Sequence, residues 1–440
     1  MVERYLANKD LEGKQNLEYV NVFAEIVSIM HQDYAGYEEK KGWDNPDYFT
    51  QKIECLETSE LMTPQLFTEI VNEYLISFKD RHMYFHLHNS EKVEAKTCGF
   101  SIRNYEDALY VTEVYEENRF GKGAKIVSID GQSISSIRKL HREMLRESHP
   151  EREEWEDIMN KAKYFELINE NEDLVKLELS LYERTPKKST YAMHFINENT
   201  LLLTFSDFRD PDRIMNLIEK HKDDLLESEN LIIDVRSNRG GNAHAFSSLL
   251  RYIFKKGEKP SSDFKVREFN CSDRNVELFL KLVEEVRNST DNGDTLKMLE
   301  FAENQFKTYQ NQGFVAFDFS EYIAEVENNF EGEDNPKNVI ILSDCYCASA
   351  GEELVEVCKE SSKVTIVGRA TMGLNDYSDL VSVNWDNQFS LYYPISRLER
   401  KTEIDPIHGK GIQPHIYIKW TPKHIEEDID LNQALKLIKS

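Results

Sequence analysis

The sequence predicts an α/β fold in which a helical segment and a β module precede a larger α/β core. Three observations carry this prediction: helical periodicity near the start, alternating strand patterns around residues 99–133, and buried strand-length runs that alternate with helices beyond residue 188. Since 440 residues exceed what one hydrophobic core usually supports, two or three domains are expected. The predicted boundaries are 1–88, 89–187 and 188–440.

Residues 1–88 are predicted to form a helical domain. Apolar residues recur at helical spacing along two stretches. The first stretch carries Tyr19, Phe23, Ile26, Val27 and Met30. The second begins at Thr63 and Pro64, and proline suits the first turn of a helix because that turn needs no hydrogen bond from its nitrogen. An Asp80-Arg81-His82 step follows this second helix and brings a histidine towards the next domain.

Residues 89–187 are predicted to form a β module. Strand-like runs at 99–103 and 108–114 are followed by a run at 122–133 that contains an Asp130-Gly131 turn. A charged insertion interrupts the module after this run. The pattern indicates a small sheet of antiparallel strands.

The α/β core, residues 188–440, is predicted from four apolar runs of strand length. These runs cover residues 200–205, 231–236, 339–343 and 364–368. A polar helical insertion at about 262–335 separates the second run from the third. It suits a lid over a cleft, a peripheral subdomain or a dimer contact equally well.

A serine stands where the third run gives way to a helix. The chain reads Ala348-Ser349-Ala350-Gly-Glu352 at this joint. A hydroxyl at a tight strand-to-helix turn is held clear of the sheet, and the amides of the helix start face any oxyanion formed beside it. Ser349 is therefore a candidate nucleophile. The alternative is an ordinary helix N-cap, a position that serine often occupies.

Two glycines follow the second run in a similar arrangement. Gly240 and Gly241 come after Ser237-Asn-Arg, and glycines at a strand end let backbone amides approach a ligand closely. With the backbone N–H of Ala350 they are candidates for an oxyanion hole. The alternative is that they only form a turn.

Four motifs in order resemble the C-terminal processing (tail-specific) serine peptidase family. They are Leu231-Ile-Ile-Asp-Val-Arg-Ser-Asn-Arg-Gly-Gly241, Ala348-Ser-Ala-Gly-Glu352, Val367-Gly-Arg-Ala-Thr-Met-Gly373 and Gly409-Lys-Gly-Ile-Gln-Pro-His-Ile-Tyr-Ile418. The resemblance spans roughly residues 188 to 420. It implies a crotonase-like (ClpP/crotonase) spiral core, a degenerate PDZ-like domain at 89–187, and a peptidase that forms an acyl-enzyme on Ser349.

The resemblance also bears on the general base. The processing-protease branch uses a lysine about 25 residues after the serine, where this chain has Leu374. The tricorn-like branch uses a histidine in an Asp-x-His step, which matches His82. Histidine suits the role because its pKa near 6.5 lets it take and return a proton at neutral pH.

The groups that orient the base depart from the tricorn-like pattern. That branch usually has a serine just before the histidine and a glutamate before the Gly-Ile-x-Pro step, and this chain offers Arg81 and His408 there. Asp80 or Asp405 could orient His82, and His408 could itself be the base. The sequence leaves these alternatives open.

Two other interpretations remain at this level. Ser349, Asp379 and His408 follow the Ser-Asp-His order of the α/β-hydrolases, but Cys347 replaces the first glycine of that nucleophile elbow. The chain could also be a catalytically impaired homologue that binds a peptide or a hydrophobic ligand.

Composition limits the partners and cofactors. A net charge of −26 argues against nucleic-acid and anionic-membrane binding, since both favour a cationic face. The six cysteines show no zinc-like spacing, so neither a metal nor another cofactor is expected. The expected partner is a peptide or unfolded protein substrate, and a homo-oligomer is compatible with the sequence. Reduced thiols and the lack of an apolar leader suggest a cytoplasmic protein, or an exported one if a leader precedes this sequence.

Overall fold

The computed structural model describes most of the chain, which divides into two compact units that are considered separately. The described residues are 18–88, 96–142, 144–145, 149–185, 187–260, 267–290, 293–318, 330–399 and 407–439. Unit 1 consists of Met1–Ser90, Phe269–Val315 and Asp379–Ser396. Unit 2 consists of Glu91–Glu268, Ala316–Ser378 and Arg397–Ser440.

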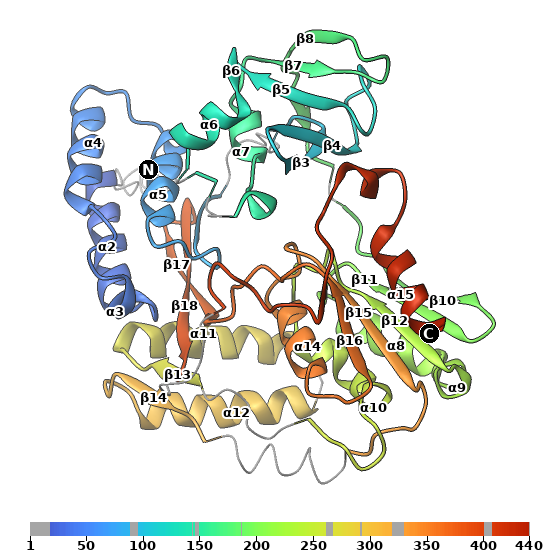
Figure 1. The fold of residues 1–440 in the computed structure, drawn as a ribbon. Coiled ribbons are helices and arrows are strands. Elements are labelled where there is room, and N and C mark those ends of the chain that lie inside the picture. The colour runs from blue at the N-terminus through green and yellow to red at the C-terminus, as the bar shows by residue number, and fades with distance from the viewer. Residues whose placement is uncertain are drawn as a thin grey trace, which may run out of the picture. The chain divides into compact units, whose positions relative to one another are not determined.

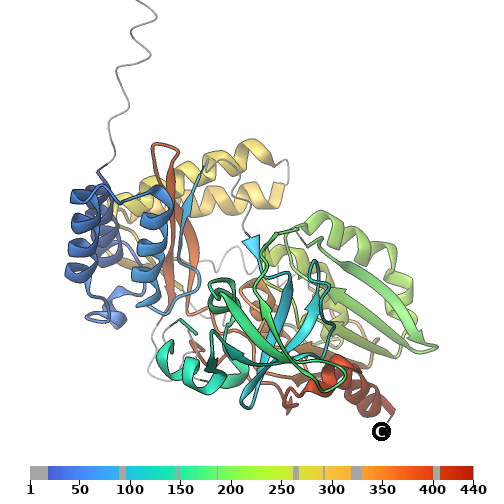
Figure 2. The same ribbon diagram turned by 90° about the horizontal axis from the view of Figure 1, so that it is seen from above.

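The N-terminal part of unit 1 is helical, as the sequence predicts. Its helices are α2 (Tyr19–Gln32), α3 (Tyr37–Lys40), α4 (Pro46–Thr58) and α5 (Pro64–Ile76). They lie alongside one another (Figure 2, blue) around an aromatic core in which the rings of Phe23 and Tyr74 are 5.1 Å apart. Thr63 caps α5 by accepting a hydrogen bond from the Leu66 amide, and Pro64 occupies the first turn.

A five-stranded sheet and two long helices complete unit 1. The strands are β1 (Tyr84–Leu87), β13 (Arg267–Asn270), β14 (Phe314–Ala316), β17 (Tyr377–Trp385) and β18 (Phe389–Leu398). The helices are α11 (Asp273–Ser289) and α12 (Gly293–Thr308). Strands β1 and β18 pair antiparallel with Phe85 opposite Leu391. This pairing ties the N-terminal residues to a segment some 300 positions later.

The core of unit 2 is a six-stranded sheet with the order β10-β11-β12-β15-β16-β19. Its strands are β10 (Tyr191–Asn197), β11 (Thr200–Phe205), β12 (Asn230–Asp234), β15 (Asn338–Ser343), β16 (Val364–Gly368) and β19 (Ile416–Tyr417). All neighbours from β11 to β19 are parallel, and only β10 is antiparallel. The four apolar runs in the sequence correspond to β11, β12, β15 and β16, which confirms their prediction as buried strands.

Helices cover both faces of this sheet, which explains why its strands are continuously apolar. On one face, Leu231 and Ile233 pack with residues of α8 (Pro211–Lys220) and α14 (Ala350–Cys358). On the other, Ile232 and its neighbours pack against Ala434 of α15 (Ile429–Lys439) (Figure 1). The segment after β12 starts as the 3₁₀ helix η2 (Ala243–Leu249) and continues as α10 (Leu250–Ile253).

A second sheet in unit 2 comes from the predicted β module. Its strands are β3 (Phe100–Tyr105), β4 (Ala108–Val114), β5 (Lys125–Ile129), β6 (Gln132–Ser133), β7 (Tyr164–Ile168) and β8 (Leu174–Glu178), and β2 (Lys96–Thr97) pairs separately with β9 (Tyr182–Glu183). Helix α6 (Ile134–Leu140) follows β6, and the charged insertion, His141 to Lys163, holds the short helices η1 (Pro150–Arg152) and α7 (Glu156–Asn160). The sheet has its own core, which includes Ile126, Trp155 and Phe165.

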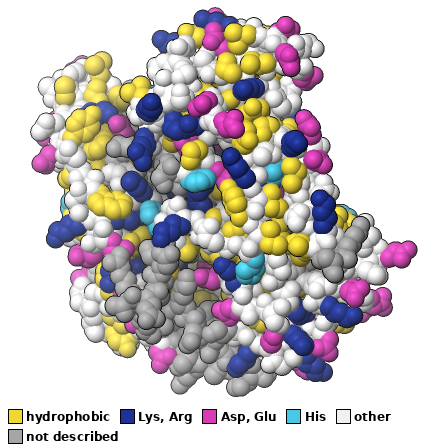
Figure 3. Space-filling model, viewed as in Figure 1, with side chains coloured by type: hydrophobic (Ala, Val, Ile, Leu, Met, Phe, Trp, Pro, Cys, Tyr) yellow, Lys and Arg dark blue, Asp and Glu magenta, His cyan; other side chains and the backbone are white. Residues whose placement is uncertain are grey.

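On the described part of the face shown in Figure 3, Lys and Arg side chains are interspersed with Asp, Glu and hydrophobic side chains. Within the described part of the chain, no helix is long and apolar enough to cross a bilayer.

Candidate active site

The candidate residues of unit 2 lie where two neighbouring parallel strands end. Strands β12 and β15 run side by side with Asp234 opposite Leu342. Because both strands point the same way, the loops that leave their carboxyl ends lie together. One loop carries Gly240 and Gly241, and the other carries Ser349. The sheet therefore brings these three predicted residues to one edge.

Ser349 is held in a strained turn. Its backbone angles are φ 53° and ψ −125°, a conformation that L residues rarely adopt and that costs about 1–3 kcal/mol. Its side chain makes no cap hydrogen bond to the helix that follows. The interpretation of Ser349 as an ordinary N-cap is therefore wrong. The serine is half-buried and its hydroxyl is left for another role.

Gly240 leaves the space that this turn needs. A Cβ atom added at Gly240 would lie 2.6 Å from the Ser349 Cβ, 2.9 Å from the Ala348 carbonyl oxygen and 3.1 Å from the Ala350 nitrogen. Gly240 also has φ +86°, which favours glycine. Any side chain at this position would both clash with the nucleophile turn and strain the backbone.

The amides around Ser349 differ in whether they are already engaged. The Gly240 N–H donates to Asn238 Oδ1 at 2.9 Å, so it is occupied. Across the described residues, the N–H groups of Gly241 and Ala350 have no acceptor. Free amides at a turn are the usual donors to an oxyanion. Gly241 and Ala350 thus have free N–H donors, whereas Gly240 leaves space for the nucleophile turn because it has no side chain.

Asn238 joins the two loops. It is fully buried, and its carbonyl oxygen accepts the Ala348 N–H at 2.9 Å. Its side chain donates to the Phe205 carbonyl at 3.2 Å and accepts from Gly240. One asparagine therefore fixes the end of β11, the glycine turn and the nucleophile turn together.

Glu352 fixes a third loop beside the nucleophile. Its buried carboxylate accepts hydrogen bonds from the Thr371 hydroxyl at 2.6 Å, the Leu374 amide at 2.7 Å and the Gly373 amide. Burial raises the pKa of Glu352, and these donors only partly offset that effect. The Ser349-x-x-Glu352 spacing is typical of a capping box, yet both side chains turn away from the helix backbone.

Hydrogen bonds connect the third loop to His408. The Asn375 side chain donates to the Ser349 carbonyl oxygen at 2.9 Å. The next residue, Asp376, accepts the backbone N–H of His408 at 2.8 Å and that of Ile407 at 3.2 Å. His408 is half-buried, and its backbone is thereby tied to the loop that contacts the nucleophile turn.

His82 belongs to unit 1, whereas Ser349 belongs to unit 2. His82 is 9% exposed, and its backbone N–H donates to Asp80 Oδ1 at 2.9 Å. The other oxygen of Asp80 accepts the Tyr34 hydroxyl at 2.8 Å, and Lys40 donates to the same hydroxyl at 2.7 Å. A buried network therefore fixes the backbone at His82. Asp405, the other candidate to orient His82, lies outside the described residues.

Three residues of this site were missed from the sequence: Asn238, Glu352 and Asn375. Each acts through a hydrogen bond to a distant segment, and polar residues near glycines look like ordinary turn residues. Asn238 and Glu352 lie within the family-like motifs, whereas Asn375 lies two residues beyond the third motif. Where the structure describes the chain, no group of histidine, cysteine and acidic residues is arranged to hold a metal ion.

Comparisons with known proteins identify similar chains. The model of peptidase family S41 matches residues 199–418. A structure of mature CPAF with lactacystin has a TM-score of 0.62 at 12% identity, covering 96% of this chain and 97% of that one. Another of mature CPAF has a TM-score of 0.60 at 11% identity, covering 96% of each chain. The photosystem II D1 C-terminal processing protease has a TM-score of 0.44 at 12% identity, covering 96% and 98%. No curated protein sequence matches the chain.

Proposed function

The chain belongs to peptidase family S41 and is a serine-type hydrolase, and from this premise we propose that it cleaves peptide bonds through an acyl-enzyme on Ser349. One observation carries the proposal: a serine in a strained turn, free of its own helix, lies against Gly240 and beside two free amides. Family membership replaces the α/β-hydrolase interpretation.

The proposed reaction uses the groups of this turn in sequence. Ser349 Oγ attacks the scissile carbonyl carbon while a base takes the hydroxyl proton, and the carbonyl oxygen becomes an oxyanion. The N–H groups of Gly241 and Ala350 stabilise that charge. The tetrahedral species collapses, the C–N bond breaks, and the base returns its proton to the leaving amine. Water then attacks the ester with the same base, which frees the acid and restores Ser349.

We propose His82 as the base and His408 as the second candidate. His82 is supported by its Asp-x-His step and by the hydrogen bond from its backbone to Asp80, which fixes the residue's position. His408 is supported by its place on the loop that Asp376 ties beside the nucleophile turn. Losing a general base typically costs about 10²–10⁴ in rate. His82→Ala is expected to show that loss, with His194→Ala, an exposed histidine of β10, as the matched control.

We also propose the finer description of the fold. The parallel sheet with helices on both faces supports a crotonase-like core at residues 188–440. The antiparallel sheet with α6 supports a degenerate PDZ-like domain at 89–187, and the helices before β1 support a helical domain at 1–88. A peptide or unfolded protein is the substrate that such a peptidase would take.

A second candidate function is peptide or ligand binding without turnover. Leu374 stands where one branch of the family has its lysine, and its backbone amide is engaged by Glu352. A leucine cannot accept a proton, so residue 374 cannot be the general base. If no other residue serves as base, a binding protein on the peptidase scaffold remains.

Peptide hydrolysis tests the choice directly. Wild type is expected to degrade an unfolded protein such as casein, and Ser349→Ala is expected to abolish this while retaining its thermal stability. Ser247→Ala is the matched control, because that exposed hydroxyl only donates to the His244 carbonyl. Equal activity of wild type and Ser349→Ala would disprove the proposal. Binding of peptide without any hydrolysis would favour the second function.

A further inference from the structure

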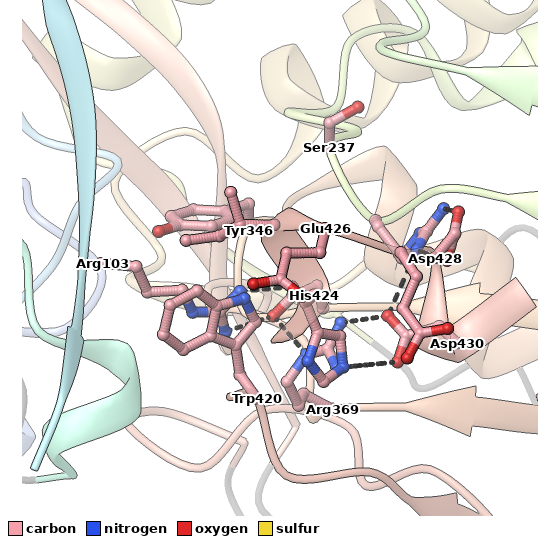
Figure 4. A pocket seen from close by; sticks show the side chains of 13 residues that line it. Arg103, Ser237, Tyr346, Arg369, Trp420, His424, Glu426, Asp428 and Asp430 are labelled. Atoms are coloured by element: carbon pink, nitrogen blue, oxygen red, sulfur yellow. Dashed lines mark hydrogen bonds and ion pairs between the residues drawn. The ribbon is translucent and has the colours of Figure 1, made fainter. Parts of the chain in front are cut away.

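Unit 2 has a pocket lined by residues from the loops that follow β12 and β15 (Figure 4). It has a volume of about 360 Å³ and opens at the carboxyl ends of three parallel strands. Arg236 and Ser237 follow β12, Asp344 and Tyr346 follow β15, and Arg369 follows β16. Arg103 of β3 and the segment from Trp420 to Asp430 complete the wall. Ligands of α/β proteins commonly bind at this edge of the sheet.

The pocket and the nucleophile share two loops. Ser237 precedes Gly240 by three residues, and Tyr346 precedes Ser349 by three residues. Three residues of chain span at most about 11 Å, and Gly240 is packed against Ser349. The pocket therefore lies within reach of a peptide bound at Ser349, at a distance that about three extended residues would cover.

The arginines of the pocket are already neutralised. Arg103 donates both ends of its guanidinium to Asp344, at 2.7 and 2.8 Å. Arg369 pairs with Asp344 at 3.0 Å and donates to Asp430 at 2.9 Å. Arg236 donates to three carboxylates, those of Asp234 (2.7 Å), Asp428 (2.7 and 2.8 Å) and Asp430 (3.2 Å). An anionic ligand would therefore have to displace an existing ion pair.

The rim carries carboxylates that are not neutralised. Three arginines and five carboxylates line the pocket, so its balance is negative when His424 is neutral. Glu426 and Glu427 are exposed, and neither is in a salt bridge with any described residue. Figure 4 shows the Glu426 side chain among the residues that line the pocket. A net charge of −26 on the whole chain adds a long-range field of the same sign.

We propose that this pocket is a substrate subsite for a lysine or arginine side chain, two to four residues from the scissile bond. Glu426 and Glu427 supply the countercharge, and the arginines below them offer none to an acidic side chain because they are already paired. This inference rests on the proposed peptidase function, since it names which substrates that site prefers.

The test separates binding from turnover. The probes are fluorescent peptides of one sequence in which lysine, arginine, norleucine or glutamate is placed in turn at each position near the cleavage site. Binding of these peptides is measured with the Ser349→Ala protein, and hydrolysis is measured with the active protein. The key variant is Glu426→Gln with Glu427→Gln. The matched control is Glu198→Gln with Asp212→Asn, which removes the same charge from two exposed positions elsewhere in unit 2.

The expected result is that lysine and arginine peptides bind better than the norleucine peptide at one position. The key variant should weaken that binding by about three- to tenfold, since exposed ion pairs are each worth little. The affinity of the key variant for the norleucine peptide, and the affinities of the control variant, should change by less than twofold. Equal weakening of basic and neutral peptides, or the same effect in the control variant, would overturn the subsite. If basic peptides bind as expected but nothing is hydrolysed, the subsite stands and the peptidase proposal fails.

Discussion

Two buried carboxylates on either side of Ser349 are held in opposite ways. Asp344, just before the nucleophile turn, is 5% exposed and is paired with the guanidinium groups of Arg103 and Arg369. Glu352, just after it, is fully buried and accepts only from a hydroxyl and two amides. Burial would raise the pKa of Asp344, but the two arginines hold it well below its usual range. Burial raises the pKa of Glu352, and neutral donors do not reverse this.

The difference separates two tasks on either side of the nucleophile turn. The ion pair between Arg103 and Asp344 joins β3 of one sheet to the end of β15 in the other. Hydrogen bonds from a hydroxyl and two amides hold Glu352 beside a reacting serine, and the Arg152 guanidinium donates to the Thr371 carbonyl of the same loop at 2.6 Å. The comparison predicts that the two carboxylates respond differently to neutral substitution and to pH.

The largest expected effect comes from Asp344→Asn. This change leaves Arg103 and Arg369 as buried cations with less countercharge, and breaking such a pair costs about 3–5 kcal/mol. Thermal unfolding measures the loss, and Asp234→Asn is the control because Arg236 keeps Asp428 as a second partner. If Asp344→Asn were as stable as the control, the pairing at Asp344 would not be a structural join.

Gly240→Ala tests the turn between the two carboxylates. The new Cβ would lie 2.6 Å from the Ser349 Cβ and displace the nucleophile from its amides. We expect kcat to fall by about 10²–10³, the cost of losing one oxyanion donor. Gly257→Ala is the control, because Gly257 has a similar φ of +83° and nothing within 4 Å. Similar losses of activity in both variants would mean that backbone strain, and not the contact with Ser349, is responsible.

Glu352→Gln is expected to have a smaller effect. The amide keeps one acceptor but turns a donor towards backbone N–H groups, which leaves a buried polar group unsatisfied at about 1–3 kcal/mol. Activity should fall together with stability because the loop that contacts Ser349 loosens. Steady-state kinetics and thermal unfolding are compared with those of Glu356→Gln, a less buried residue of the same helix. Full activity of Glu352→Gln together with a lowered unfolding temperature would contradict the role given to Glu352.

The smallest expected effect is the pH dependence of these two stability differences, about 1 kcal/mol for each unit of pKa shift. The lowered pKa of Asp344 means that its stabilisation is present above pH 4 and is lost as the pH falls through the folded value. The raised pKa of Glu352 means the reverse: its contribution is present below pH 4 and is lost as the pH rises through the folded value. Unfolding of wild type and both variants is measured from pH 8 down to pH 2, and the Asp344 contribution should fall below pH 4 while the Glu352 contribution should fall as the pH rises above it. Parallel trends would contradict the comparison.

Much of the fold could be predicted from the sequence because its signals are local. The runs at 200–205 and 364–368 coincide with β11 and β16, and Thr63-Pro64 begins α5 as predicted. Strands buried on both faces are continuously apolar, and that pattern is visible without a structure. The serine at the end of β15 could be singled out for the same reason.

Other features depend on contacts between distant segments. The Gly240 amide is occupied by Asn238, which leaves the free donors on Gly241 and Ala350, and no local pattern distinguishes these glycines. The Ser349-x-x-Glu352 spacing predicts a capping box, but Glu352 is drawn instead to a loop about twenty residues later. In both cases, contacts with residues distant in the sequence determine which groups are free and which are engaged.

The most direct test of the central claim is covalent labelling of Ser349. A fluorophosphonate probe is reacted with the folded protein, and the modified residue is located by mass spectrometry of its peptides. The account predicts one adduct on Ser349 that is absent from Ser349→Ala and greatly reduced in Gly240→Ala. Labelling that persists in Ser349→Ala, or no labelling of a folded wild-type protein, would contradict it.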